Sequence, residues 1–161
     1  MKLSFRHYGD GDPISLEYIS QIPGMRSIVS AVYDVLPGKV WPRESLKKIK
    51  ESCEKHNLVF DIVESVPVHE DIKLGRGKCD EYIDVYCENI RRCAEIGVKC
   101  ITYNFMPVFD WLRSDLDYKL EDGSSALIFK QAEVDALNPV ESDLSLPGWD
   151  ASYTMDGLRA L

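Results

Sequence analysis

Apolar, β-branched runs alternate with helical patterns along the first hundred residues of this chain. The runs are typical of short buried strands and predict them at four places: Leu3–Arg6, Ser27–Val32, Val59–Glu64 and Val98–Asn104. Strands separated by helices favour repeated βα units, in which neighbouring strands run parallel. The pattern therefore predicts an α/β fold built on a parallel sheet.

Three helical patterns lie between these strands. The first follows Asp12 and Pro13, which we expect to act as N-cap and first-turn residues. Pro42 opens the second, whose apolar residues recur at intervals of three and four. The longest covers Asp80–Ile96 and ends before Gly97, and its apolar stripe predicts a buried face made of Ile83, Tyr86, Cys87, Ile90, Cys93 and Ala94.

The spacing of the units points to a barrel. The predicted strands begin at residues 3, 27, 59 and 98, at separations of 24, 32 and 39 residues, close to the roughly 30 residues per unit of a (β/α)8 TIM barrel. We therefore expect about the first four βα units of such a barrel in residues 1–105. A complete small α/β protein that covers its sheet edge by dimerising remains the alternative.

The sequence pattern changes after Met106, and no further strand is predicted there. Residues 106–153 are polar and punctuated by proline and glycine, which favours a long loop insertion after the fourth strand. At Thr154, a suitable N-cap, a helix is expected to begin and to occupy residues 154–161. We thus interpret residues 1–161 as the N-terminal part of a single TIM-barrel domain.

Composition excludes several classes of function. The 161 residues are 45% hydrophobic and 29% charged, as in a globular domain. Lys and Arg number 19 against 27 Asp and Glu, a net charge of −8, so nucleic acid is not an expected partner. No apolar run approaches the ~20 residues that span a bilayer, and we expect no membrane contact and a cytoplasmic location.

The five cysteines form an odd number without a CxxC pair. This pattern favours reduced thiols over disulfides or a structural zinc site. Most of them are expected to be small core residues.

Polar residues follow the predicted strand ends, where ligands bind in parallel α/β folds. These residues supply a guanidinium, carboxylates, imidazoles, phenols and an amide. We expect this set to bind a small hydroxylated anion, because the planar fork of an arginine pairs with a carboxylate. Arg6 either contacts such a ligand or pairs with Glu64 or another carboxylate. Glu64 is explained equally by function or by a structural ion pair. The adjacent His69, Glu70 and Asp71 have metal-binding side chains, but neighbours in one loop seldom converge on one ion.

Five segments at these same positions resemble the mannonate dehydratases: SFRHYG (4–9), DPISLEYI (12–19), VESVPVHEDIK (63–73), YNFMPVFDW (103–111) and LEDGSSAL (120–127). The resemblance runs in register across essentially the whole chain, including LPGWDASYT (146–154), and corresponds to the front part of the family. Three positions depart from the pattern: His7 replaces a tryptophan, Thr102 a cysteine and Leu112 a threonine.

The resemblance implies a xylose isomerase-like barrel and a hydro-lyase that removes water from D-mannonate to give 2-keto-3-deoxy-D-gluconate in hexuronate breakdown. It implies a sugar acid as partner, a homo-oligomer, and a divalent metal, Mn²⁺ or Fe²⁺, whose ligands are expected outside this chain. The substrate-pocket positions that it implies are Arg6, Tyr8, Glu64, His69, Tyr103, Asn104 and Trp111.

With the metal ligands and acid–base residues expected elsewhere, we expect this chain alone to be inactive. A sugar isomerase or epimerase on the same barrel, or a catalytically silent half barrel, are the alternatives.

Overall fold

A computed structural model describes residues 2–106, 113–136 and 156 of the chain. The chain divides into two compact units, residues 1–105 and 106–161. We describe each unit by itself.

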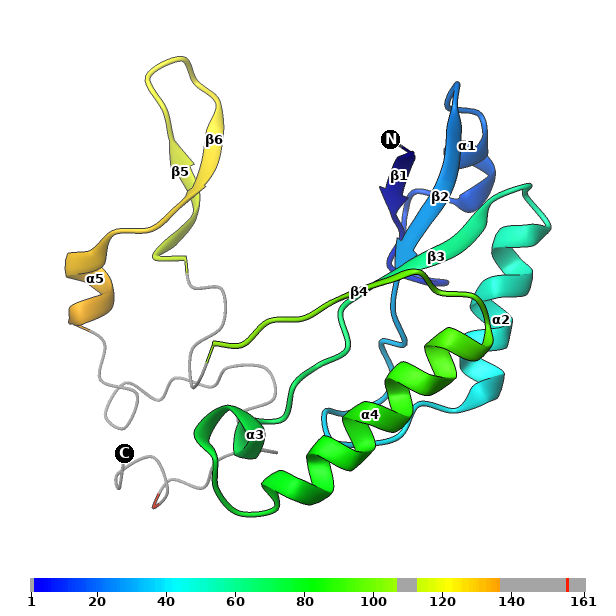
Figure 1. Ribbon diagram of the computed structural model, residues 1–161. Helices are drawn as coiled ribbons and strands as arrows, with labels where there is room; N and C mark the ends of the chain where they lie inside the picture. Colours follow the sequence, from blue (N-terminus) through cyan, green and yellow to red (C-terminus); the bar gives the residue numbers. More distant parts are fainter. Residues whose placement is uncertain (1, 107–112, 137–155, 157–161) are drawn as a thin grey trace. The chain divides into compact units, whose positions relative to one another are not determined.

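The first unit is a four-stranded parallel sheet with helices between its strands (Figure 1). Its elements, in chain order, are β1 (Leu3–Arg6), α1 (Leu16–Ser20), β2 (Met25–Ser30), α2 (Arg43–Glu54), β3 (Val59–Glu64), α3 (Glu70–Leu74), α4 (Cys79–Glu95) and β4 (Cys100–Thr102). The strands lie in the order β1-β2-β3-β4, and each neighbouring pair is parallel. The predicted alternation and the parallel sheet are confirmed, and they fit part of a TIM-barrel-like fold.

The two faces of the sheet differ in chemistry because successive side chains point to opposite sides of a strand. Ile28, Phe60 and Val63 are at most 3% exposed and belong to the core on the helix side. Arg6 lies beside Val29 of β2, on the opposite face, and a register shift between β2 and β3 after Ile28 and Phe60 brings Ile62 beside Val29 on that face. The sheet thus separates an apolar helix side from a polar face that carries Arg6.

Helix α2 covers the core with one side only. Leu46 and Cys53 are buried, while Lys47 and Glu51 on the other side form an exposed ion pair one turn apart. Pro42 stands at the N-cap, as its fixed φ allows.

Two predicted strands have the wrong bounds. β2 is Met25–Ser30, because the apolar Ala31 and Val32 that follow are buried in a loop. β4 is only Cys100–Thr102, because the amide of Val98 donates to the carbonyl of Cys93 at the end of α4. Apolar character in these residues reflects burial in the core rather than extended pairing.

The first helix begins later than predicted. Ser15 is its N-cap, accepting a hydrogen bond from the amide of Tyr18 at 3.2 Å. Asp12 instead accepts from the amides of Tyr8 and Ile14, at 2.7 and 2.8 Å. The Asp12 carboxylate therefore closes the loop after β1, which removes it as a helix cap.

Helix α3 was not predicted, and His69 is its N-cap. The Nδ1 atom of His69 accepts from the amide of Asp71 at 3.1 Å, which makes the imidazole an N-cap. Gly75, with φ of 61°, ends the helix in the left-handed conformation.

The long helix α4 is found within one residue of its predicted bounds at each end, but its predicted buried stripe is only partly buried. Cys93 is fully buried, whereas Ile83 and Ile90 are each 41% exposed. The prediction that most cysteines lie in the core is also wrong: all five are free, but only Cys53 and Cys93 are buried.

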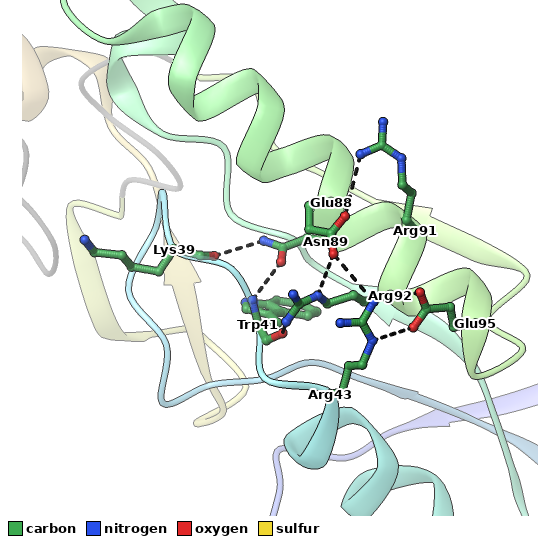
Figure 2. Close-up of polar contacts among 8 residues, drawn as sticks. All are labelled: Lys39, Trp41, Arg43, Glu88, Asn89, Arg91, Arg92 and Glu95. Atoms are coloured by element: carbon green, nitrogen blue, oxygen red, sulfur yellow. Dashed lines mark hydrogen bonds and ion pairs between the residues drawn. The ribbon is translucent and has the colours of Figure 1, made fainter.

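A buried asparagine attaches the loop between β2 and α2 to α4 (Figure 2). The side chain of Asn89, 4% exposed, accepts from the amide of Trp41 at 2.7 Å and donates to the carbonyl of Lys39 at 3.0 Å. Arg92 donates to the carbonyl of Trp41 at 2.8 Å, and Arg43 forms two hydrogen bonds with Glu95. These bonds fix the far end of the loop against the helix.

The second unit contains an antiparallel hairpin of β5 (Asp115–Lys119) and β6 (Ser125–Ile128), followed by α5 (Gln131–Asp135). The expectation of no strand after Met106 is therefore wrong. The turn closes with a hydrogen bond of 2.9 Å from the amide of Leu120 to the carbonyl of Ser124, and Gly123 within it has φ of 83°. The hairpin was overlooked because its short strands are largely exposed and carry charged residues.

The predicted helix over 154–161 lies outside the described residues except for Asp156, which is helical. Among the described residues, no helix has both the length and the apolar character needed to cross a membrane.

Candidate functional site

Arg6 and Glu64 meet on the polar face of the sheet. Arg6 is the last residue of β1 and Glu64 the last of β3, so both stand at the carboxyl ends of parallel strands. Arg6 Nη1 lies 2.6 Å from Glu64 Oε1, and the two side chains are 33% and 47% exposed. Of the two roles expected for Arg6, the pairing with Glu64 is present, at the edge where ligands bind in such sheets, and ligand contact stays a prediction.

Two tyrosines surround the guanidinium. The Arg6 Cζ lies 4.7 Å from the ring centroid of Tyr8, a cation–π distance. The rings of Tyr8 and Tyr33 lie 6.0 Å apart, and Tyr33 forms a side-chain hydrogen bond with Arg6. Burial opposes the charge of Arg6, but the bond to Tyr33 and the attraction of Glu64 outweigh it and raise the Arg6 pKa.

Sequence reasoning missed Tyr33, although a signal was present. Tyr33 follows the end of β2 by three residues, whereas the predicted site residues all follow or end β1, β3 and β4. The same rule applied to β2 would have included it. Its hydroxyl also donates to the carbonyl of His7 at 3.2 Å, which ties the loops after β1 and β2 together.

One donor at this cluster has no acceptor. The Nε of Arg6 is buried and has no hydrogen-bond partner among the described residues. A buried donor without a partner costs about 1–3 kcal/mol. The guanidinium therefore has hydrogen-bonding capacity that Glu64 and Tyr33 do not use.

His69 lies against α4 rather than beside Arg6. Its ring stacks on Tyr82 with the centroids 3.7 Å apart. Burial lowers the His69 pKa, against the opposing attraction of Asp71 and Glu70. His69 thus connects α3 with α4 as a neutral imidazole.

Tyr103 also faces α4. It is 61% exposed and lines two surface hollows together with Tyr86. Asn104 follows it, partly buried, and Trp111 lies outside the described residues. The structure therefore brings together Arg6, Tyr8 and Glu64 of the seven predicted positions, while His69 and Tyr103 lie against the helix.

A cavity of about 310 Å³ lies on the helix side of β1 and β2, and Tyr8 and Tyr33, which surround the Arg6 guanidinium, are among the residues that line it. His7 also lines it, and its Nδ1 accepts from the amide of Gly9 at 3.3 Å. Lys48 and Asp10 form an exposed ion pair of 2.6 Å at the cavity. Cys53 lies on its apolar wall, and burial raises its thiol pKa to about 12, so this cysteine is a protonated core residue and not a nucleophile.

Comparison with known proteins agrees with this geometry. The family model described as "D-mannonate dehydratase (UxuA)" matches residues 1–161. The chain belongs to the mannonate dehydratase family. It is 52% identical over 161 residues to mannonate dehydratase 2 of Halalkalibacterium halodurans and 53% identical to the mannonate dehydratase of Streptococcus uberis. The resemblance predicted from the motifs is confirmed.

A solved mannonate dehydratase has the same fold. The crystal structure of the Streptococcus suis serotype 2 enzyme matches 99% of this chain with a TM-score of 0.82 and 42% identity. The match covers 46% of that chain, and the alignments to the H. halodurans and S. uberis proteins cover 47% and 46% of their lengths. This chain thus spans less than half the length of these mannonate dehydratases.

The described residues do not fit the metal that the resemblance implies. No group of three or more His, Cys, Asp or Glu side chains in the described part of the chain is arranged to hold an ion. Glu64, the carboxylate of the cluster, is already paired with Arg6, whose charge repels a second cation. A divalent metal with ligands elsewhere in a longer mannonate dehydratase stays a prediction.

Proposed function

We propose that this chain forms the carboxylate-binding part of a mannonate dehydratase that converts D-mannonate into 2-keto-3-deoxy-D-gluconate. The Arg6 cluster carries this proposal, within a chain that matches the family over its whole length. Arg6, Tyr8 and Glu64 lie together at the carboxyl ends of parallel strands, and Tyr33 completes the cluster.

Arg6 suits the carboxylate of a sugar acid for two reasons. Its guanidinium presents several donors in one plane and accepts a carboxylate with two parallel bonds. An arginine is charged throughout the range in which proteins work, and its neighbours raise the Arg6 pKa further. In the described structure its carboxylate partner is Glu64, half-exposed, and a substrate carboxylate would share or replace that contact.

The tyrosines give the cluster its shape. The ring of Tyr8 already packs on one side of the Arg6 guanidinium, and Tyr33 bonds to it. Both rings offer apolar faces to the carbon chain of a hydroxylated acid, and their hydroxyls offer hydrogen bonds. Glu64 and Tyr33 thus orient Arg6, while Arg6 and Tyr8 meet the ligand.

The reaction is a β-elimination. The C–H bond next to the carboxylate loses its proton, the electron pair forms a carbon–carbon double bond, and the neighbouring hydroxyl leaves with a proton as water. The resulting enol becomes the keto acid. Arg6 contributes by holding the carboxylate and by stabilising the negative charge that develops on it as the C–H proton leaves.

We propose that Tyr103, Asn104 and Trp111 border the substrate and that the acid, the base and the metal site come from outside this chain. His69 acts through α3, which it caps, rather than by touching the substrate. The chain alone is accordingly expected to release no keto-deoxy acid.

A chimera tests the proposal. Residues 1–161 of this chain replace the matching 161 residues of the S. uberis mannonate dehydratase, which are 53% identical. The chimera is expected to convert D-mannonate into a keto-deoxy acid. Arg6→Ala in it should lower kcat/KM by about 10–100-fold, the loss of one charged hydrogen-bonding partner. Lys47→Ala, in an exposed pair on α2, is the matched control.

Two results would overturn the proposal. One is an Arg6→Ala chimera with the activity of the unmodified chimera and the same unfolding midpoint. The other is a chimera that interconverts sugars without loss of water, which would assign the chain to an isomerase or epimerase.

A further inference from the structure

The peptide that joins His7 to Tyr8 is held by side chains from three positions in the chain. Its carbonyl oxygen accepts from the hydroxyl of Ser30 at 2.7 Å and from that of Tyr33 at 3.2 Å. Its amide, which belongs to Tyr8, donates to the carboxylate of Asp12 at 2.7 Å. Both polar groups of this one peptide unit are therefore bound by side chains, and we call the arrangement the 7–8 clamp.

The clamp lies directly after a backbone hydrogen bond of the sheet. The amide of His7 donates to the carbonyl of Val29 at 2.9 Å, which continues the pairing of β1 with β2 one residue beyond Arg6. Ser30, the last residue of β2, is 1% exposed, and its hydroxyl binds the carbonyl of His7. Ser30 thus uses its side chain to extend the bonding of the sheet to the next peptide of the chain.

Asp12 holds the other side of the clamped peptide. Its carboxylate accepts from the amides of Tyr8 and Ile14, and its own amide donates to the carbonyl of Gly9 at 3.0 Å. The bond from Tyr8, followed by that from Ile14, lowers the pKa of Asp12. Hydrogen bonds from amides to a charged carboxylate are stronger than those between neutral groups. Asp12 therefore binds the peptide as a carboxylate at neutral pH.

The clamp is connected to the groups that we propose meet the ligand. Tyr8 follows the clamped peptide directly, so the position of its ring, 4.7 Å from Cζ of Arg6, depends on the plane of that peptide. Tyr33 has one polar side-chain group, its hydroxyl, which donates to the clamp and also bonds to Arg6. A rotation of the peptide would therefore move the ring of Tyr8 and take a partner from Tyr33.

We propose that Ser30 and Asp12 are positioning residues for the carboxylate of a sugar acid. They fix the 7–8 clamp, and the clamp holds the ring of Tyr8 and the guanidinium of Arg6 in the arrangement that binds this carboxylate. The inference rests on the proposed function of the Arg6 cluster and adds to it two residues that act through the backbone. Loss of the clamp weakens substrate binding, so it should raise the KM more than it lowers kcat.

Ser30→Ala in the chimera with the S. uberis protein tests the proposal. The substitution removes one hydrogen bond of the clamp, and the KM for D-mannonate should rise about 3–10-fold, the factor that corresponds to one such bond. The value of kcat should change by less than about twofold. Ser30→Thr keeps a hydroxyl at this position and should return the KM to within about twofold of that of the unmodified chimera.

Ser27→Ala is the matched control. Ser27 lies in the same strand, is also 1% exposed and also donates its hydroxyl, but to the carboxylate of Asp61. Its loss should lower the unfolding midpoint at least as much as Ser30→Ala does, because the acceptor is charged and buried, and it should leave the KM unchanged. A KM that rises equally in both variants, or in neither, would overturn the proposal.

Two variants of Asp12 test the other side of the clamp. Asp12→Ala removes the acceptor, whereas Asp12→Asn keeps a side-chain oxygen for the amide of Tyr8, so the KM should rise more in the first. Since Ser30 and Asp12 hold the same peptide, combining Ser30→Ala with Asp12→Ala should raise the KM by less than the product of the two single effects. Effects that multiply in full would mean that the two residues act independently, against the proposal.

Failure of the proposed function itself is seen elsewhere, in the unmodified chimera and in Arg6→Ala. An activity-free measurement on this chain keeps the clamp testable in that case: the NMR signal of the Arg6 Nε–H group, assigned by its loss in Arg6→Lys. Ser30→Ala should shift this signal, because the ring of Tyr8 moves relative to the guanidinium, and Ser27→Ala should not. A signal that Ser30→Ala leaves in place would overturn the proposal.

Discussion

The imidazole of His69 lies stacked on the phenol ring of Tyr82, with ring centroids 3.7 Å apart and planes 22° from parallel. Gly38, in the loop between β2 and α2, lies against both rings. Three segments distant in sequence therefore meet at one small contact, and Asn89 fixes the same loop three residues further on. The stability of this contact can be tested one residue at a time.

Gly38→Ala should be more destabilising than Gly24→Ala. Both glycines have positive φ, 77° and 80°, so alanine at either position carries a similar backbone strain of about 1 kcal/mol. A Cβ on Gly38 would lie 2.7 Å from Tyr82 Cε1 and 2.9 Å from His69 Cδ2, whereas nothing lies within 4 Å at Gly24. We expect Gly38→Ala to cost a further ~1–3 kcal/mol in urea unfolding. Equal losses would show that the rings move aside freely.

His69 should make the chain less stable in mild acid. Burial lowers its pKa below the ordinary value of 6.5, so the folded state prefers the neutral ring. Its contribution to stability is present above pH 6.5 and is lost as the pH falls through the lowered pKa. Protonation also removes the Nδ1 acceptor that caps α3.

The matched variant for this pH dependence is His69→Asn, which keeps an acceptor at the N-cap but does not titrate. The difference in unfolding free energy between the original chain and the variant is measured by urea titration from pH 8 to pH 5. It should shift in favour of the variant as the pH falls. A difference that stays constant would contradict the assignment.

Asn89→Ala should be among the costly substitutions. The Asn89 side chain is buried and bonds to the amide of Trp41 and the carbonyl of Lys39. The substitution removes both hydrogen bonds. The expected loss is about 2–4 kcal/mol of unfolding free energy. Glu95→Gln weakens the neighbouring ion pair of Glu95 with Arg43. The two side chains are 49% and 54% exposed, so this variant should lose less than ~1 kcal/mol of unfolding free energy. Similar losses for the two variants would mean that Asn89 has replacement partners.

Glu64→Gln should hardly change stability although it removes an ion pair of 2.6 Å. With 33% and 47% of the two side chains exposed, water screens the pair, and a loss below ~1 kcal/mol is expected in urea unfolding. The same variant in the chimera should raise the KM for D-mannonate, because Arg6 loses the group that orients it. A loss of 3 kcal/mol or more would show that the pair is mainly structural.

The sequence determined the alternation of the four parallel strands with the helices α1, α2 and α4. β1 and β3 were predicted with their observed bounds, and α4 within one residue at each end, because a repeating pattern of apolar residues depends only on which side of an element is buried. The motifs also identified the family, since five matching segments in register carry far more information than any single spacing.

The tertiary structure decided which polar residues meet. Arg6 and Glu64 are 58 positions apart and come together only because β1 and β3 flank β2 in a parallel sheet. His69 follows the end of β3 by five residues, as Tyr8 follows the end of β1 by two, yet it stacks on α4, because capping α3 turns its ring toward that helix. Local sequence specifies on which element a side chain lies, whereas its direction and its partners depend on the packing of residues far along the chain.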